Sequence, residues 1–371
     1  MGNIIDYVRE HGDISFLQEP LNEVDSLVLC QMVYMNFGRF VPGLEERNQL
    51  ISIQDIYHHP DRDHLLDDYW YKQYNKELFE AAADSRRFGT LKMNYYVNVI
   101  NVDDETQFSA ITYILENKET YIAYRGTDAT IIGWKEDLNL AFSKPLSSQH
   151  LSVAYMDKVS SWIAGSFYAG GHSKGGNLAM YTAMQCDDAL QEKILSVYDN
   201  DGPGFPEAFF SSEKVEKVLP KVTRIIPEAS VIGMLLNHQK DPLIVASTQK
   251  GILQHDAFTW EVMGPSFIEK ESLTRRAAAS DRSLHKWIDH MDERQREHLI
   301  GELFSVLEAT GAETISQIQD GGLKSLAAMV RQLDKLEPRS KIMVQELIAG
   351  IFGSWLELLP LPELDKKRFL P

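Results

Sequence analysis

Residues 171–175 carry the arrangement with the clearest chemical meaning, a serine with a glycine two positions away on each side (G-H-S-K-G). An apolar stretch typical of a strand precedes the serine and an apolar helical stretch follows it, so Ser173 falls at a sharp strand-to-helix turn. Gly171 and Gly175 suit that turn, because the two backbone segments approach closely there. A phosphate-binding turn is the alternative, but no Walker lysine–serine/threonine pair follows the glycines. The segment therefore predicts a nucleophile elbow.

A serine nucleophile needs a base, and the histidines that follow Ser173 in the chain are His238, His255, His285, His290 and His298. In serine hydrolases built on such an elbow, the chain order is nucleophile, acid, histidine. His255 lies in the turn before the last predicted strand, residues 258–262, which makes it the preferred base. His238 lies in a polar loop and is the alternative. The other three fall on polar faces of predicted helices.

Three carboxylates are candidates for the acid that orients the imidazole. Asp199 and Asp201 end a predicted strand near residues 195–199, and Glu228 follows the next one, near residues 223–226. An acid at either strand end can orient one imidazole. Asp201 is preferred, Glu228 is the alternative and Asp199 comes third. A purely turn-forming role also explains the Asp-Gly-Pro sequence that begins at Asp201.

The elements that must position these residues change along the chain. Residues 1–90 predict mainly helices, and residues 91–264 predict β-rich segments followed by alternating strands and helices. Alternation of this kind is typical of a mostly parallel sheet covered by helices, an α/β fold. Residues 265–371 predict amphipathic helices, since apolar residues recur there at helical spacing. We expect a catalytic core between helical N-terminal and C-terminal regions.

Composition narrows the classes of function. The net charge of −17 disfavours nucleic acid and anionic lipid headgroups as partners. The two cysteines, Cys30 and Cys186, lie in apolar patterns and predict core thiols in a reducing compartment. We expect a cytoplasmic protein, because neither a signal peptide nor an apolar stretch of membrane-spanning length is evident. The histidine-rich segment 58–64 is interrupted by Pro60, which favours a polar loop over a metal site.

Two segments together resemble a known family. Residues 171–176 resemble the elbow of lipase-class-3-type hydrolases and of related bacterial hydrolases of unknown substrate. Upstream, the Arg-Gly-Thr-Asp block at residues 125–128, followed by Trp134 and Asp137, is similar to a block of the same group. The resemblance extends over residues 95–262 and implies an α/β-hydrolase fold.

The resemblance also implies roles for further residues. Thr127 would help to form the oxyanion hole, with the backbone N–H of Lys174 as the second donor. Trp134 and Asp137 would be structural. The sequence departs from the family at the acid, since Ser230 stands where an aspartate is expected and Glu228 lies two residues earlier.

The predicted function is hydrolysis of an ester-like acyl substrate, of lipase or esterase type, through a Ser-His-acid triad and an acyl-enzyme. This chemistry needs neither a metal nor an organic cofactor, and its partner is a small-molecule or lipid-like acyl compound. Thioester and amide substrates stay open, because the fold does not determine the substrate. The alternative is a catalytically degenerate binding or scaffold protein, which the serine at position 230 favours.

Overall fold

The computed structural model describes residues 2–66, 72–101, 106–127, 145–274, 293–312 and 315–358. The chain forms two compact units, each described here by itself. The first consists of Met1–Gly126 and Pro145–Ala278, and the second of Thr127–Lys144 and Ala279–Pro371. The sequence had predicted breaks near residues 90 and 264. Strand pairing crosses both of these positions, because Ile51–Ser52 pairs with the start of the strand Lys92–Asn101, and Val262–Met263 pairs with Ser266–Phe267.

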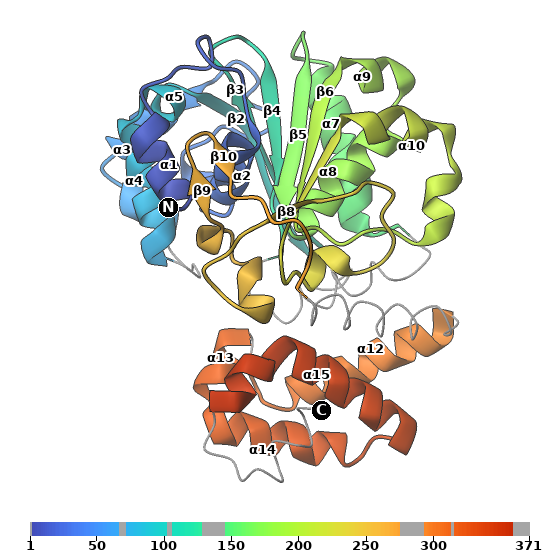
Figure 1. The fold of residues 1–371 in the computed structure, drawn as a ribbon. Coiled ribbons are helices and arrows are strands. Elements are labelled where there is room, and N and C mark those ends of the chain that lie inside the picture. The colour runs from blue at the N-terminus through green and yellow to red at the C-terminus, as the bar shows by residue number, and fades with distance from the viewer. Residues whose placement is uncertain are drawn as a thin grey trace. The chain divides into compact units, whose positions relative to one another are not determined.

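An eight-stranded sheet forms the centre of the first unit, and its spatial order follows the chain order (Figure 1). The strands are β1 (Ile51–Ser52), β2 (Lys92–Asn101), β3 (Thr106–Ile114), β4 (Thr120–Tyr124), β5 (Phe167–His172), β6 (Ile194–Asn200), β7 (Val222–Pro227) and β8 (Leu243–Val245). Pairings are antiparallel from β1 to β4 and parallel from β4 to β8. The mostly parallel sheet confirms the predicted α/β-hydrolase fold. Its parallel strands, β4 to β8, end at one edge of the sheet, where the candidate residues follow.

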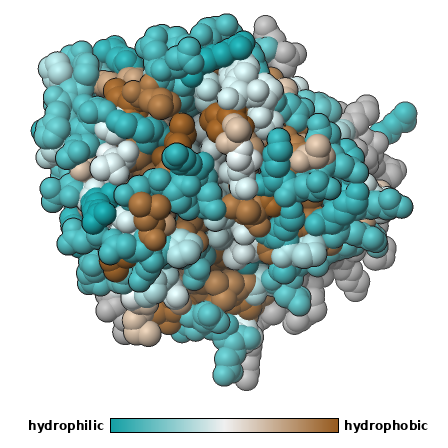
Figure 2. All heavy atoms as spheres, turned by 90° about the horizontal axis from the view of Figure 1, so that it is seen from above, coloured by the Kyte–Doolittle hydropathy of each residue, from teal (hydrophilic) through white to brown (hydrophobic). Residues whose placement is uncertain are grey.

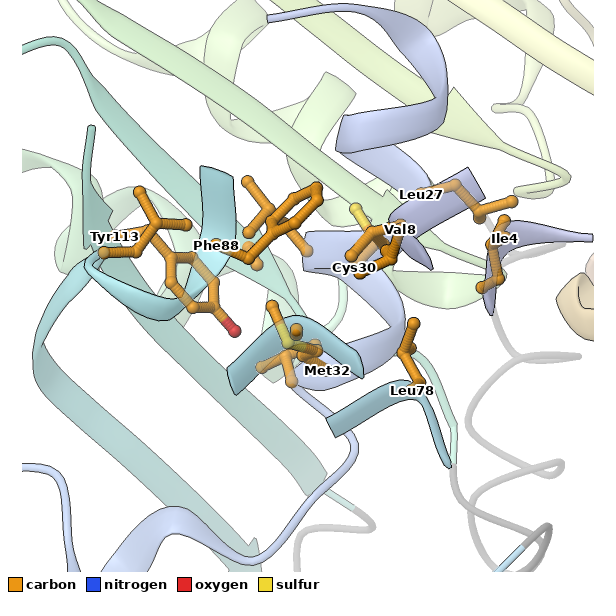
Figure 3. Packing of buried hydrophobic residues seen from close by; sticks show 14 of the residues in the cluster. Ile4, Val8, Leu27, Cys30, Met32, Leu78, Phe88 and Tyr113 are labelled. Carbon is orange, nitrogen blue, oxygen red and sulfur yellow. The ribbon is translucent and has the colours of Figure 1, made fainter. Parts of the chain in front are cut away.

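Helices cover both faces of this sheet, as buried parallel strands require (Figure 1). One face carries α7 (Ser147–Ser160), α8 (Lys174–Gln185), α9 (Asp188–Lys193) and α10 (Glu213–Val218). The other carries the N-terminal helices α1 (Ile4–His11), α2 (Glu23–Met32), α3 (Ile53–Tyr57), α4 (Lys72–Asp84) and α5 (Arg86–Gly89). The N-terminal helices share one apolar core with the sheet. Figure 3 shows Val8, Cys30, Leu78 and Phe88 gathered with Tyr113 of β3.

Short elements complete the first unit. They are η1 (Phe37–Arg39), η2 (Arg62–Leu66), η3 (Glu207–Ser211), η4 (Leu219–Lys221), η5 (Ile232–Met234), η6 (Gly251–His255), η7 (Ala257–Thr259), β9 (Val262–Met263) and β10 (Ser266–Phe267). The predicted strand at residues 258–262 is wrong at its start. The Asp256 carboxylate accepts a hydrogen bond from the Phe258 N–H at 3.0 Å and begins the turn η7, so extended backbone starts at Trp260, which forms a β-bridge with Ser247, and β9 starts at Val262.

The second unit is helical where the structure describes it. It contains α12 (Glu293–Glu308), α13 (Ile315–Asp320), α14 (Gly322–Leu333) and α15 (Pro338–Leu358). Its apolar core includes Leu303, Phe304 and Leu307 of the predicted helical pattern, together with Met329 and Ile348. The predicted C-terminal helices therefore pack on one another.

The surface is mixed in character. Seen from above, hydrophobic side chains reach it in separate patches within a mostly hydrophilic face (Figure 2). Isolated exposed hydrophobic residues such as Met263 are ordinary for folded proteins. Among the described residues, no helix combines the length and hydropathy needed to cross a membrane.

Candidate active site

Ser173 lies between the end of β5 and the first residue of α8. Its backbone angles, φ 59° and ψ −133°, fall in a region that residues other than glycine rarely adopt. A Cβ on Gly171 would lie 2.0 Å from the carbonyl carbon of Gly175, and one on Gly175 would lie 2.2 Å from the oxygen of Tyr124. Both glycines are therefore sterically required. The elbow is held to the next strand by the Ser173 N–H, which donates to the Asn200 carbonyl at 2.9 Å.

The side chain and the backbone of Lys174 serve different ends. Its ammonium group is fully buried and donates to the Gln107 carbonyl of β3 at 2.9 Å. A lysine beside a serine can act as its base, but this contact holds the ammonium group of Lys174 on β3. The backbone N–H of Lys174 opens helix α8, whose N-terminal dipole favours negative charge beside Ser173.

Gly126 brings the end of β4 against the nucleophile. A Cβ built on it would lie 3.1 Å from the Cβ of Ser173 and 2.4 Å from the carbonyl oxygen of His172. The next residue in the chain, Thr127, is half-buried. Asp128, Trp134 and Asp137, the remaining members of the upstream block, lie outside the described residues.

The structure brings Asp201 and His255 together. His255 ends the turn η6, and its Nδ1 lies 2.6 Å from Oδ2 of Asp201, which directly follows β6. Because a carboxylate accepts, Nδ1 carries the proton, and Nε2 is left as the basic atom. Asp201 is fully buried, whereas the His255 side chain is 21% exposed. The Asp201 carboxylate is thus shielded from solvent, while the imidazole of His255 stays partly accessible.

The alternative acids have other partners. The Glu228 carboxylate lies 4.0 Å from the Lys270 ammonium group and is partly exposed. Asp199 is fully buried, accepts from the Gly202 N–H at 2.9 Å and lies 3.9 Å from Nε of Arg224. Burial raises the pKa of Asp199 to about 7, against the opposing effect of the Arg224 guanidinium.

The other histidines that follow Ser173 have their own surroundings where the structure describes them. His238 is half-buried rather than exposed as its polar loop predicted, and it lies beside Gly204. His298 pairs with Glu302 at 3.3 Å on helix α12 of the second unit. His285 and His290 lie outside the described residues.

His172 contacts His255, and the sequence did not predict this contact. Its Nε2–H donates to the backbone carbonyl of His255 at 2.8 Å, and the centres of the two rings are 4.6 Å apart. The hydroxyl of Tyr34 lies 3.4 Å from Nδ1 of His172. Burial, reinforced by the neighbouring His255, lowers the pKa of His172 to about 3, so this ring stays neutral. The adjacency of His172 to Ser173 was the one available signal.

In the part of the chain that the structure describes, no group of three or more His, Cys, Asp or Glu side chains could hold a metal ion. In the histidine-rich segment, His58 is exposed, and Nδ1 of His59 accepts from the backbone N–H of Asp61 at 3.1 Å. The segment forms a polar turn.

Comparison with known proteins places the chain in a protein family. The family model described as Mbeg1-like matches residues 82–305, more than half of the chain. A search of curated proteins finds no match. Similar solved structures include a lipase from Rhizomucor miehei in a propeptide complex, at 19% identity and a TM-score of 0.33, over 45% of this chain and 58% of that one. A second is the M37 lipase, at 14% identity and a TM-score of 0.39, over 74% and 84% of the two chains.

The family match includes the strand–elbow–helix segment, the Asp201–His255 pair and the parallel half of the sheet. The match also extends beyond the first unit into helix α12. The chain belongs to the Mbeg1-like family.

Proposed function

We propose that the protein is a serine hydrolase of ester-like acyl substrates, with Ser173 as nucleophile, His255 as base and Asp201 as acid. The observation that carries the proposal is the 2.6 Å contact between His255 Nδ1 and Asp201. It forms at the sheet edge where β5 delivers Ser173 in a strained elbow. This combination supports the choice of Asp201 over Glu228.

The groups can perform acyl transfer in two steps. The Ser173 Oγ forms a bond to the substrate carbonyl carbon as its proton passes to Nε2 of His255. The bond to the alkoxy oxygen then breaks, and the leaving alkoxide takes that proton. Water then attacks the acyl carbonyl carbon as its proton passes to Nε2 of His255; the bond between this carbon and Oγ breaks, the carboxylic acid leaves, and the proton returns to Oγ. Asp201 stabilises the imidazolium formed in each step.

The negative charge that develops on the carbonyl oxygen of the substrate must be stabilised by hydrogen-bond donors. We assign the backbone N–H of Lys174 and, from the resemblance, Thr127 to this oxyanion hole. Gly126 supports this assignment, since its close approach to Ser173 brings the strand that precedes Thr127 to the nucleophile. A small-molecule or lipid-like acyl compound is the proposed substrate, and no cofactor enters the reaction.

Hydrolysis of p-nitrophenyl esters across acyl lengths, together with fluorophosphonate labelling, tests the proposal. Ser173→Ala should abolish labelling and turnover, and His255→Ala should abolish turnover. Asp201→Asn should lower kcat by about 10³- to 10⁴-fold, because the imidazole loses the partner that sets its tautomer. Glu228→Gln is the matched control and should stay close to wild type. Absence of labelling in folded protein would favour the alternative, a degenerate hydrolase-fold binding protein.

A further inference from the structure

The carboxylate of Asp201 is held on both of its oxygens. Oδ2 faces His255, while Oδ1 accepts from the hydroxyl of Ser230 at 2.5 Å and from the backbone N–H of Gly233 at 3.1 Å. Asp201 is fully buried, and Ser230 is only 4% exposed. Two donors on one oxygen and one on the other leave the carboxylate little freedom to rotate.

The direction of the Ser230 hydrogen bond follows from its neighbours. The Gly233 N–H also donates to the Ser230 Oγ at 3.0 Å, so that oxygen acts as an acceptor there. The hydroxyl has a single proton, and Asp201 Oδ1 is the acceptor within reach of it. Ser230 therefore accepts a hydrogen bond from the Gly233 N–H and donates one to the Asp201 carboxylate.

The turn that carries these donors is anchored to the sheet. It follows β7, and the Ser230 N–H donates to the Pro227 carbonyl at 3.0 Å. The guanidinium of Arg224, on β7, donates to the Gly233 carbonyl. A Cβ on Gly233 would lie 2.3 Å from Oδ1 of Asp201, so the close approach of this backbone to the acid requires glycine.

We propose that Ser230 is a positioning residue for the catalytic dyad, which fixes the plane of the Asp201 carboxylate so that Oδ2 points at His255. The proposal rests on the proposed function for its catalytic consequence, but its structural part does not. Without the hydroxyl, Oδ1 keeps one donor, and a buried carboxylate that lacks a donor reorients or recruits water. The hydrogen bond to His255 then loses its defined geometry.

The test compares Ser230→Ala with Ser230→Thr, which keeps the hydroxyl, and with Ser152→Ala as the matched control. Ser152 is a fully buried serine of α7, and its hydroxyl donates to the Gln149 carbonyl at 2.7 Å. Two quantities are measured on the full chain: ester hydrolysis, and the downfield proton resonance of the His255 Nδ1–H in protein with isotope-labelled histidine. Circular dichroism establishes that each variant is folded.

We expect Ser230→Ala to lower kcat by about tenfold while KM stays within about twofold, since the contact acts on the base rather than on substrate binding. Its His255 resonance should shift or broaden. Ser230→Thr should restore both quantities, and Ser152→Ala should change neither.

An unchanged resonance in Ser230→Ala would overturn the proposal, whatever the activity. An unchanged kcat in an active enzyme would do the same. If the wild type neither hydrolyses esters nor labels, the proposed function fails, and the resonance still decides whether Ser230 positions Asp201.

Discussion

At the scale of single residues, the site depends on two unusual backbone conformations. Ser173 and Asp201 both have positive φ, 59° and 55°, and they follow the adjacent strands β5 and β6. Asp tolerates the left-handed region, but the ψ of −133° at Ser173 is costly for any residue with a side chain. The strain persists because glycines on both sides leave room for the turn.

Substitution of Gly171 by alanine tests this requirement. The new Cβ would overlap the Gly175 carbonyl carbon at 2.0 Å, and neither backbone segment can move without displacing the elbow. We expect a large drop in Tm and loss of fluorophosphonate labelling. Gly301→Ala is the control, because its Cβ meets nothing within 4 Å and alanine favours its helix. Normal labelling of folded Gly171→Ala protein would contradict this account.

At the scale of elements, β5 is tied to the turn η6. His172 ends β5 and donates to the carbonyl of His255, which ends η6, so the strand that precedes Ser173 and the turn that carries His255 are directly bonded. Tyr34, just after α2, contacts the same histidine. An N-terminal element therefore supports the site.

The neutral state of His172 predicts a pH dependence of stability. Its pKa is lowered to about 3 in the folded protein, whereas in the unfolded chain it is about 6.5. Between these values the unfolded state binds a proton that the folded state does not bind. The contribution of His172 to the free energy of unfolding should therefore decrease by about 1.4 kcal/mol per pH unit as the pH falls from 6.5 toward 3.

Chemical denaturation at several pH values measures this slope. His172→Gln, which keeps a neutral donor, should show a shallower decrease than wild type between pH 6.5 and pH 4. Carboxylates titrate in both proteins, so the difference between the two slopes isolates His172. Equal slopes would show that the folded protein accommodates a charged ring at this position.

At the scale of the whole molecule, the N-terminal helices are part of the first compact unit, which also carries Ser173, Asp201 and His255. They share an apolar core with the sheet, and a buried ion pair between Asp25 of α2 and Arg87 of α5 joins them. Nε of Arg87 donates to Asp25 Oδ1 at 2.7 Å, and the Tyr7 hydroxyl donates to the same oxygen at 2.8 Å. Further bonds run from the guanidinium to backbone carbonyls.

Breaking this pair should destabilise the unit. Asp25→Asn leaves the guanidinium buried without its counter-charge, which costs about 3–5 kcal/mol of unfolding free energy. Denaturant unfolding provides the measurement. Asp188→Asn is the control, because its pair with Lys217 is exposed and should contribute nothing measurable. An equal, small effect of both variants would mean that the N-terminal helices are not stabilised through Arg87.

The sequence by itself determined the local chemistry. The elbow was predictable because its Gly-x-Ser-x-Gly pattern lies within five residues, 171–175, although the carbonyl of Tyr124 in a neighbouring strand also requires glycine at position 175. The alternation of strands and helices predicted the α/β fold for the same reason, since apolar periodicity is a local property. The last predicted strand starts later than expected, because a side-chain cap by Asp256 places Phe258 and Thr259 in the turn η7.

Only the tertiary structure shows which contacts the two candidate acids make. Asp201 and Glu228 follow adjacent strands, and the sequence preferred Asp201 but left Glu228 open. The choice depends on where distant residues lie: His255 and Ser230 converge on Asp201, whereas Lys270 is placed beside Glu228. The contact between His172 and His255 spans 83 residues of chain. Such contacts depend on how the fold brings strand ends and turns together. Local sequence patterns cannot predict them, because the contacting residues are far apart in the chain.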